Sequence, residues 1–137
     1  FRRITYKEAS ASFLFYICAM SQLSEDELHQ LAMTTVGQSL EADGYEFLAV
    51  NSAPKKDPQF VCTKDKTLCF VVVRHVRYPQ NPNEFDAKLM SQVKEHAIKF
   101  KAKTYFAGVG FAHASDYNKP LSKNEPYAVN FNGIKEI

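Results

Sequence analysis

The chain lacks tryptophan, and it has only five glycines and three cysteines in 137 residues. With so few glycines there is no Gly-rich linker or low-complexity tract, which predicts a single domain over residues 1–137. Cys18, Cys62 and Cys69 form no CxxC pair, which argues against a disulfide framework and a cysteine zinc site. A cytoplasmic protein with Cys62 and Cys69 as buried free thiols is the simplest interpretation. A cross-strand disulfide between them is the alternative.

The sequence also lacks an apolar run long enough to span a bilayer, so no membrane partner is predicted. The longest run near the start, FLFYICAM at residues 13–20, follows three cations within the first seven residues. A signal peptide is one interpretation. A core helix over about residues 6–20 is favoured, because Glu8 interrupts the charged region and no small-residue cleavage site follows. Since the first residue is Phe1 and not Met, we also expect further residues to precede it.

Charge of one sign is not in excess either. The net charge is +2 and the pI is about 8.4, which by itself indicates neither nucleic acid nor a membrane surface. The four histidines, at positions 29, 75, 96 and 113, include no pair with the helical spacing of a zinc site. We therefore predict no metal site and no cofactor. A hydrophobic content of 45%, with 11 Phe and 7 Tyr, is sufficient for a core without either.

What the sequence does contain is an alternation of helical and strand patterns. Ser24 and Glu27 form a capping box that opens an amphipathic helix, and Gly44 is placed to end it. Continuously apolar residues from Cys69 to Val73 predict a central strand covered on both faces. The full set is helices at 6–20, from 24 and from 81, and strands at 45–50, 59–63, 68–76, 104–111 and 127–131. The predicted order is α-α-β-β-β-α-β-β, an α/β domain with a mixed sheet of about four to five strands flanked by helices.

The second and third predicted strands form a hairpin. If Asp65 and Lys66 are its two-residue turn, Cys62 faces Cys69 and Gln59 faces Val72. Asp57 then faces Arg74 if the pairing extends that far. Since residues two apart share a face of the sheet, the sequence predicts that Asp57, Gln59, Val72 and Arg74 lie together.

This succession of a helix, GYEFL and a hairpin ending in FVVVR resembles the core of the PD-(D/E)XK, or restriction-endonuclease-like, superfamily. The layout is closest to that of a family of small bacterial proteins with this fold, and the resemblance covers about residues 24–111. Such proteins carry an aspartate on the first arm of the hairpin and a Glu-x-Lys on the second. The two carboxylates hold a magnesium ion that activates water for phosphodiester cleavage.

The resemblance implies that the catalytic motif is degenerate here. The aspartate position is Gln59, the glutamate position is Val72 and the lysine position is Arg74. Valine cannot ligate a metal, and arginine does not readily lose its proton. Asp57 is the best candidate for a displaced ligand, and its alternative role is an ion pair with Arg74. Gly108 and Gly110 are interpreted as close-packing positions in a strand.

We therefore expect a non-catalytic, nuclease-like protein with a binding or scaffolding role, whose partner is nucleic acid or another protein. For nucleic acid, the expected phosphate contacts are Lys55, Lys56, Arg74 and Arg77, with Tyr78 beside them. One alternative is a metal-dependent nuclease with ligands rearranged around Asp57, which would need magnesium. Another is a structural or protein-binding module with no affinity for nucleic acid. The sequence leaves the oligomeric state open.

Overall fold

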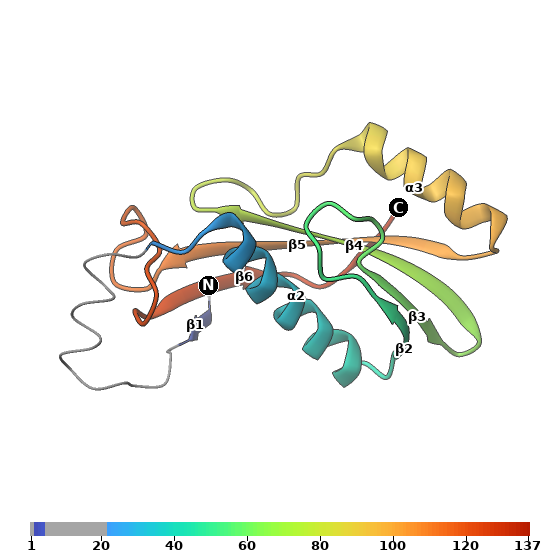
Figure 1. Ribbon diagram of the computed structural model, residues 1–137, viewed down its shortest axis with the longest axis horizontal. Helices are drawn as coiled ribbons and strands as arrows, with labels where there is room; N and C mark the ends of the chain where they lie inside the picture. Colours follow the sequence, from blue (N-terminus) through green and yellow to red (C-terminus); the bar gives the residue numbers. More distant parts are fainter. Residues whose placement is uncertain (1, 5–21) are drawn as a thin grey trace.

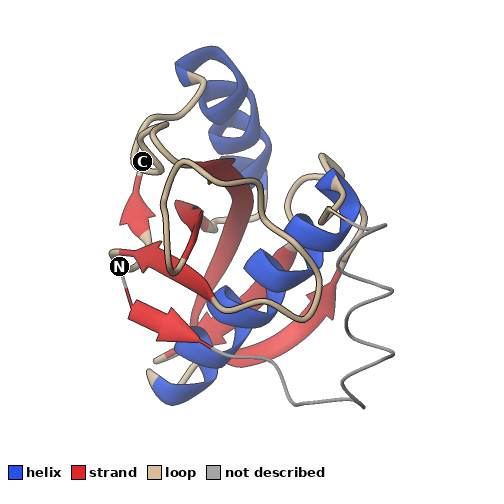
Figure 2. Cartoon of the chain, turned by 90° about the vertical axis from the view of Figure 1, so that its left-hand side faces the viewer, coloured by secondary structure: helices blue, strands red, loops and turns tan. Residues whose placement is uncertain are grey.

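The computed structural model describes residues 2–4 and 22–137 of the chain. They form a mixed sheet with one helix on each face (Figures 1 and 2). The helices are α2 (Glu25–Ala42) and α3 (Ala87–Lys99). The strands are β1 (Arg2–Ile4), β2 (Glu46–Val50), β3 (Phe60–Lys64), β4 (Thr67–Arg77), β5 (Lys103–His113), β6 (Tyr127–Phe131) and β7 (Lys135–Glu136).

The strand order is β1-β6-β5-β4-β3-β2, with β7 paired to β5 beyond the end of β6. The long strands β4 and β5 run parallel at the centre, joined by the crossover through α3. The α/β class and the mixed sheet are confirmed. The predicted order is wrong, because the described residues give β-α-β-β-β-α-β-β-β. The short strands β1 and β7 were not predicted, and the helix predicted over 6–20 lies outside the described residues.

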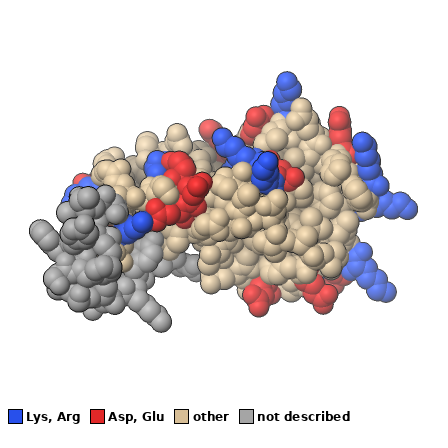
Figure 3. Space-filling model, viewed as in Figure 1, with Lys and Arg blue, Asp and Glu red and all other residues tan. Residues whose placement is uncertain are grey.

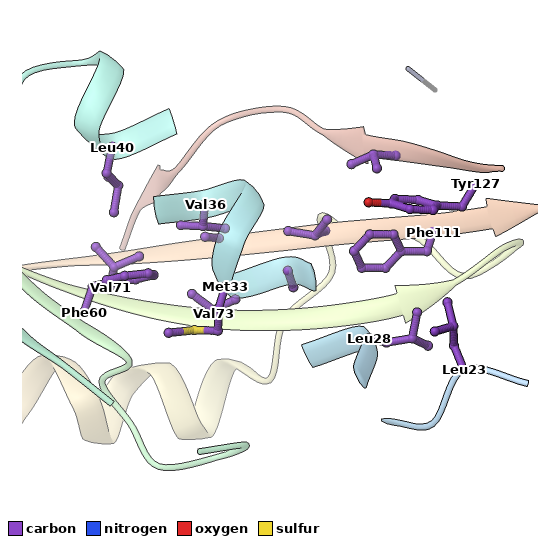
Figure 4. Close-up of a cluster of buried hydrophobic side chains, with 14 of the residues drawn as sticks. Leu23, Leu28, Met33, Val36, Leu40, Phe60, Val71, Val73, Phe111 and Tyr127 are labelled. Carbon is purple, nitrogen blue, oxygen red and sulfur yellow. The ribbon is translucent and has the colours of Figure 1, made fainter. Parts of the chain in front are cut away.

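The core follows from the alternation of side chains along β4. Val71 and Val73 point to the face covered by α2, where Met33, Val36 and Leu40 of the helix meet them (Figure 4). Val72 points to the other face and packs with Met90 and Val93 of α3 and Phe106 of β5. All three valines are fully buried, so the prediction of a strand covered on both faces is confirmed.

The start of α2 is as predicted. The Ser24 hydroxyl accepts from the Glu27 backbone N–H at 3.1 Å, and the Glu27 carboxylate accepts from the Ser24 N–H at 3.1 Å. Gly44, with a φ of +88°, follows the C-cap residue Asp43 in the left-handed conformation that glycine adopts without cost.

The start of α3 differs from the prediction. Asn81 accepts from the backbone N–H of Asn83 at 3.0 Å, and this closes a local turn before the helix. Asp86 is the N-cap, and its Oδ1 accepts from the N–H groups of Lys88 and Leu89 at 3.0 and 3.1 Å. The helix therefore starts at Ala87. The Asp86 side chain caps its first N–H groups, whereas the Asn81 side chain is already bonded within the preceding loop.

The connection between β4 and α3 passes directly over β5. A Cβ atom on Gly108 would lie only 1.7 Å from the Pro82 carbonyl oxygen, and one on Gly110 would lie 3.3 Å from Pro82 Cγ. Only glycine permits this approach at position 108, which agrees with its interpretation as a close-packing residue.

Candidate functional site

The hairpin of β3 and β4 has the predicted register. Cys62 pairs with Cys69, and Asp65 and Lys66 form the turn with φ of +51° and +65°. Positive φ at both central residues is the geometry of a tight hairpin turn whose twist matches that of the strands. Strand pairing extends to Phe60 and Val71, and the chain before it leads into the connection at residues 51–58.

Asp57, at the end of that connection, binds Arg74 of β4 through both carboxylate oxygens. The Arg74 Nη1 and Nη2 groups donate to Oδ1 at 2.8 Å and to Oδ2 at 2.6 Å. The Asp57 side chain is 11% exposed and that of Arg74 is 24% exposed. Burial acts to raise the pKa of Asp57, but hydrogen bonding from Arg74 and Gln59, together with the charge of Arg74, outweighs it, and this pKa lies below its ordinary value. We call this pair the hairpin clasp.

Gln59, at the predicted aspartate position, is fully buried and extends the ladder between the two strands. Its Oε1 accepts from the Val73 backbone N–H at 2.8 Å, and its own N–H donates to the Val71 carbonyl at 3.0 Å. The side chain thus provides an acceptor for a β4 N–H that lies beyond the last strand pair. Its Nε2 forms no hydrogen bond of ordinary geometry with the described residues, but the side chain helps to lower the pKa of Asp57.

Val72, at the predicted glutamate position, packs against α3 as a core residue and has no exposed surface. The structure thus brings Asp57 and Arg74 together, while Gln59 and Val72 serve the sheet and the core. In the chain from 22 to 137, no three His, Cys, Asp or Glu side chains are grouped so that they could hold a metal ion.

A second polar cluster joins the start of α2 to the end of β4. Glu25 binds the His75 Nε2 at 2.6 Å and the Arg77 Nη1 at 2.5 Å, and the other Arg77 nitrogen, Nη2, donates to the Leu23 carbonyl at 3.1 Å. Hydrogen bonding from His75, together with the charge of Arg77, lowers the pKa of Glu25. We call the Glu25–Arg77 pair the strand-end pair.

His29 of α2 lies beside this cluster and is only 2% exposed. Its ring centroid is 6.2 Å from that of His75, in an edge-on arrangement, and its Nε2 has no hydrogen-bond partner among the residues described. Burial is the main cause that lowers the pKa of His29, and the charges of His75 and Arg74 add to it. This shift favours the neutral form of the His29 ring.

The four cations proposed to contact phosphate have different surroundings. Arg74 and Arg77 each bind a carboxylate, whereas Lys55 and Lys56 are exposed on the connection. Figure 3 shows basic and acidic side chains next to one another on the face of the molecule that is seen in Figure 1, without a large patch of one charge. Of the four predicted phosphate contacts, Lys55 and Lys56 are therefore the two for which no ion pair with a carboxylate is found within the described structure.

The other predictions concern cysteines and histidines. Cys62 and Cys69 are free thiols, and burial raises the pKa of Cys62 to about 11, which makes it a poor nucleophile at neutral pH. His113 binds Glu125 through Nε2 and accepts from the Ser115 N–H at 3.1 Å, so it fixes the connection between β5 and β6.

Sequence reasoning missed two features, namely the role of Glu25 and the residues around the ends of β4 and β5. In the sequence Glu25 is only an acid at the start of a helix, and its partners His75 and Arg77 lie about fifty residues away along the chain. A usable signal is present, because a strand, a helix and a strand in succession indicate a parallel pair, and ligands bind at the carboxyl ends of such strands.

Comparisons with known proteins give one match. No curated protein and no solved structure matches the chain, and nothing in these comparisons links it to the restriction-endonuclease-like proteins. Neither described helix is both long and apolar enough to cross a membrane. A family model matches residues 26–137, which include α2 from its second residue, α3 and every strand from β2 to β7. The chain belongs to the family described as "Domain of unknown function (DUF8840)".

Proposed function

We propose that this chain is a non-catalytic binding protein with a restriction-endonuclease-like arrangement, and that its ligand is nucleic acid. The observation that carries the first part is the hairpin clasp, in which both oxygens of Asp57 bind Arg74. The layout from α2 through the hairpin to β5 supports the proposed architecture.

The clasp argues against metal-dependent cleavage at this position. Magnesium binds through one or two carboxylates together with water and phosphate oxygens. Asp57 is the carboxylate that lies beside Arg74, and a metal would have to displace two short hydrogen bonds from the Arg74 guanidinium. Gln59 Oε1 is already used by the Val73 N–H, and Val72 has no ligand atom. A binding role remains compatible with every one of these contacts.

Support for nucleic acid comes from the cations near the hairpin. Lys55 and Lys56 are exposed at the tip of the connection, where their charges can approach a phosphate backbone. Arg77 is half exposed, with 47% of its side chain accessible, although it is paired with Glu25. Binding of this kind is electrostatic, so it weakens steeply with salt.

The test is a fluorescence-anisotropy titration with labelled duplex DNA and single-stranded RNA, at about 50 and 200 mM salt with magnesium present. We expect salt-dependent binding without cleavage. Replacing Lys55 and Lys56 by Ala should weaken it several-fold. The matched control replaces Lys88 and Lys94, two exposed lysines of α3, by Ala and should bind like the wild type.

Two results would overturn parts of this proposal. Cleavage with magnesium or manganese that is lost in Asp57→Ala would establish the alternative, a nuclease with rearranged ligands. No binding of either nucleic acid at low salt would overturn the ligand and leave a protein partner as the remaining class.

A further inference from the structure

A cleft of about 230 Å³ lies at the carboxyl ends of the parallel strands β4 and β5. Residues of four segments line it: Gln22 and Leu23 before α2, Arg77 and Tyr78 at the end of β4, Phe111 and Ala112 of β5, and residues 117–121 between β5 and β6. In open α/β sheets, ligands bind in the crevice outside the carboxyl ends of the strands. The position of this cleft therefore suits a ligand better than the clasped hairpin does.

Two tyrosines from different segments form an aromatic wall in the cleft. The ring centroids of Tyr78 and Tyr117 are 5.1 Å apart with an interplanar angle of 61°, and each residue is 40% exposed. The edge-on arrangement orients the two rings differently, and the exposed part of each residue can contact a planar group. Exposed tyrosine rings of this kind are the surfaces on which unpaired bases stack.

Two cations lie in the same cleft. Lys119 is exposed, and its backbone N–H donates to the Asp116 carbonyl at 3.0 Å, which closes a turn in the segment. The Arg77 guanidinium is held in place by Glu25 and the Leu23 carbonyl while nearly half of the side chain stays exposed. A guanidinium that is already oriented loses little conformational entropy when it binds a phosphate.

The size and continuation of the cleft indicate how a ligand would enter it. A second hollow of about 260 Å³ lies beside it; Arg77 and Tyr78 line both hollows, and Glu25, His75 and Gln80 are among the other residues that line the second. Clefts or cavities that bind small molecules usually measure about 300–1,000 Å³. Two smaller open hollows in a row fit successive units of a chain better than one enclosed molecule.

We propose that this cleft binds single-stranded nucleic acid, with a base against Tyr78 and Tyr117 and the adjoining phosphates at Arg77 and Lys119. The assignment rests on the proposed function, since it places the nucleic-acid contact at a specific site. A duplex does not fit the chemistry as well, because its bases are already stacked and paired and their faces are not available to tyrosine.

The test measures binding of a labelled oligonucleotide of about 12 nucleotides, by anisotropy, to the whole chain and to two pairs of variants. Tyr117→Leu removes the ring and should weaken binding by about 5- to 100-fold, whereas Tyr117→Phe keeps the ring and should bind within about 2-fold of wild type. Lys119→Ala should weaken binding and reduce its salt dependence, whereas Lys94→Ala on α3 should not. Thermal unfolding of each variant confirms that it is folded.

The outcomes separate the site from the function. Binding by the wild type that is equally strong in Tyr117→Leu, Lys119→Ala and their controls would overturn the cleft and leave the proposed function standing. No binding of single strand or duplex at low salt would overturn both. Competition by a free nucleoside monophosphate as effective as the unlabelled strand would overturn the strand as ligand and assign the cleft to a single nucleotide.

Discussion

Two arginines of β4, three residues apart, each bind a carboxylate from another part of the chain, and the two pairs differ in burial. In the hairpin clasp, Arg74 is 24% exposed and Asp57 is 11% exposed. In the strand-end pair, Arg77 is 47% exposed and Glu25 is 67% exposed. The same pairing of charges therefore has two different environments within one strand.

The difference in burial determines what each pair can do. A largely buried guanidinium loses its water and depends on its partner, so removal of that partner leaves an uncompensated charge. An exposed pair is solvated on its open side and contributes little to stability, but its cation remains accessible to a ligand. The clasp thus belongs to the structure of the hairpin, and the strand-end pair borders the cleft.

The largest effect is expected when the clasp is broken. Asp57→Ala should lower the free energy of unfolding by about 2–3 kcal/mol, because the largely buried Arg74 charge then keeps its hydrogen bond to the Val73 carbonyl but has no carboxylate to balance it. Chemical denaturation with urea measures it. Arg74→Met combined with Asp57→Ala should cost less than the sum of the single changes, and strict additivity would show that the two residues do not interact.

Next in size is the loss of the Gln59 acceptor, beside the clasp. Gln59→Leu should cost about 1–2 kcal/mol, because the Val73 N–H is left buried without an acceptor. Urea denaturation gives the value. Thr104→Val is the matched control, since the buried Thr104 hydroxyl has no hydrogen-bond partner within the described part of the chain. A loss as large as that of Gln59→Leu in the control would contradict this account.

A smaller loss of stability is expected on acidification, and its source is His29, which lies near both ion pairs. The pKa of His29 is lowered in the folded state, so the unfolded chain takes up its proton first. Stability from this group is fully present above the ordinary histidine pKa of about 6.5 and is lost as the pH falls below it. The residues that face the ring are His75 and Arg74 of β4, Asp57 and Ser52 of the connection, and Asp26 of α2.

Denaturation from pH 7 down to about 5 measures the loss of stability at His29, and a two-dimensional NMR titration follows each histidine ring separately. His29→Gln should flatten the decline in stability over this range. His96→Gln, an exposed position on α3, should leave the decline as it is in the wild type. An equal decline in His29→Gln and the wild type would show that another group is responsible.

The smallest effect is expected at the strand-end pair. Glu25→Ala should change the free energy of unfolding by about 0.5 kcal/mol, as is usual for exposed ion pairs. Asp26→Ala removes an acid from the same helical turn and leaves the Glu25–Arg77 pair in place. A loss in Glu25→Ala close to that in Asp57→Ala would remove the distinction between the two pairs.

Local signals in the sequence predicted the hairpin and α2 well. The turn at Asp65 and Lys66 fixed the register between β3 and β4, because the spacing of two strands around a two-residue turn leaves one pairing. Ser24 and Glu27 determined where α2 begins, since both members of the capping box lie within one turn.

The predictions failed where two residues competed for one role, where an element was too short, or where partners lie far apart in the sequence. The start of α3 was placed too early, because Asn81 and Asp86 are both suited to cap a helix and only the fold decides between them. The strand β7 has two residues, too few for a pattern of alternation. The ion pair of Asp57 and Arg74 was predicted from the register, whereas Glu25 and Arg77 lie on separate elements with no register to relate them.

The close approach of Pro82 to Gly108 limits how the sequence of this family can vary. A mutation of Gly108 to any other residue places an atom where the Pro82 carbonyl oxygen already lies. Natural variation at position 108 should therefore occur only with insertions, deletions or a changed path in the segment between β4 and α3. Among members of the family, glycine at this position and the length of that segment should be inherited together.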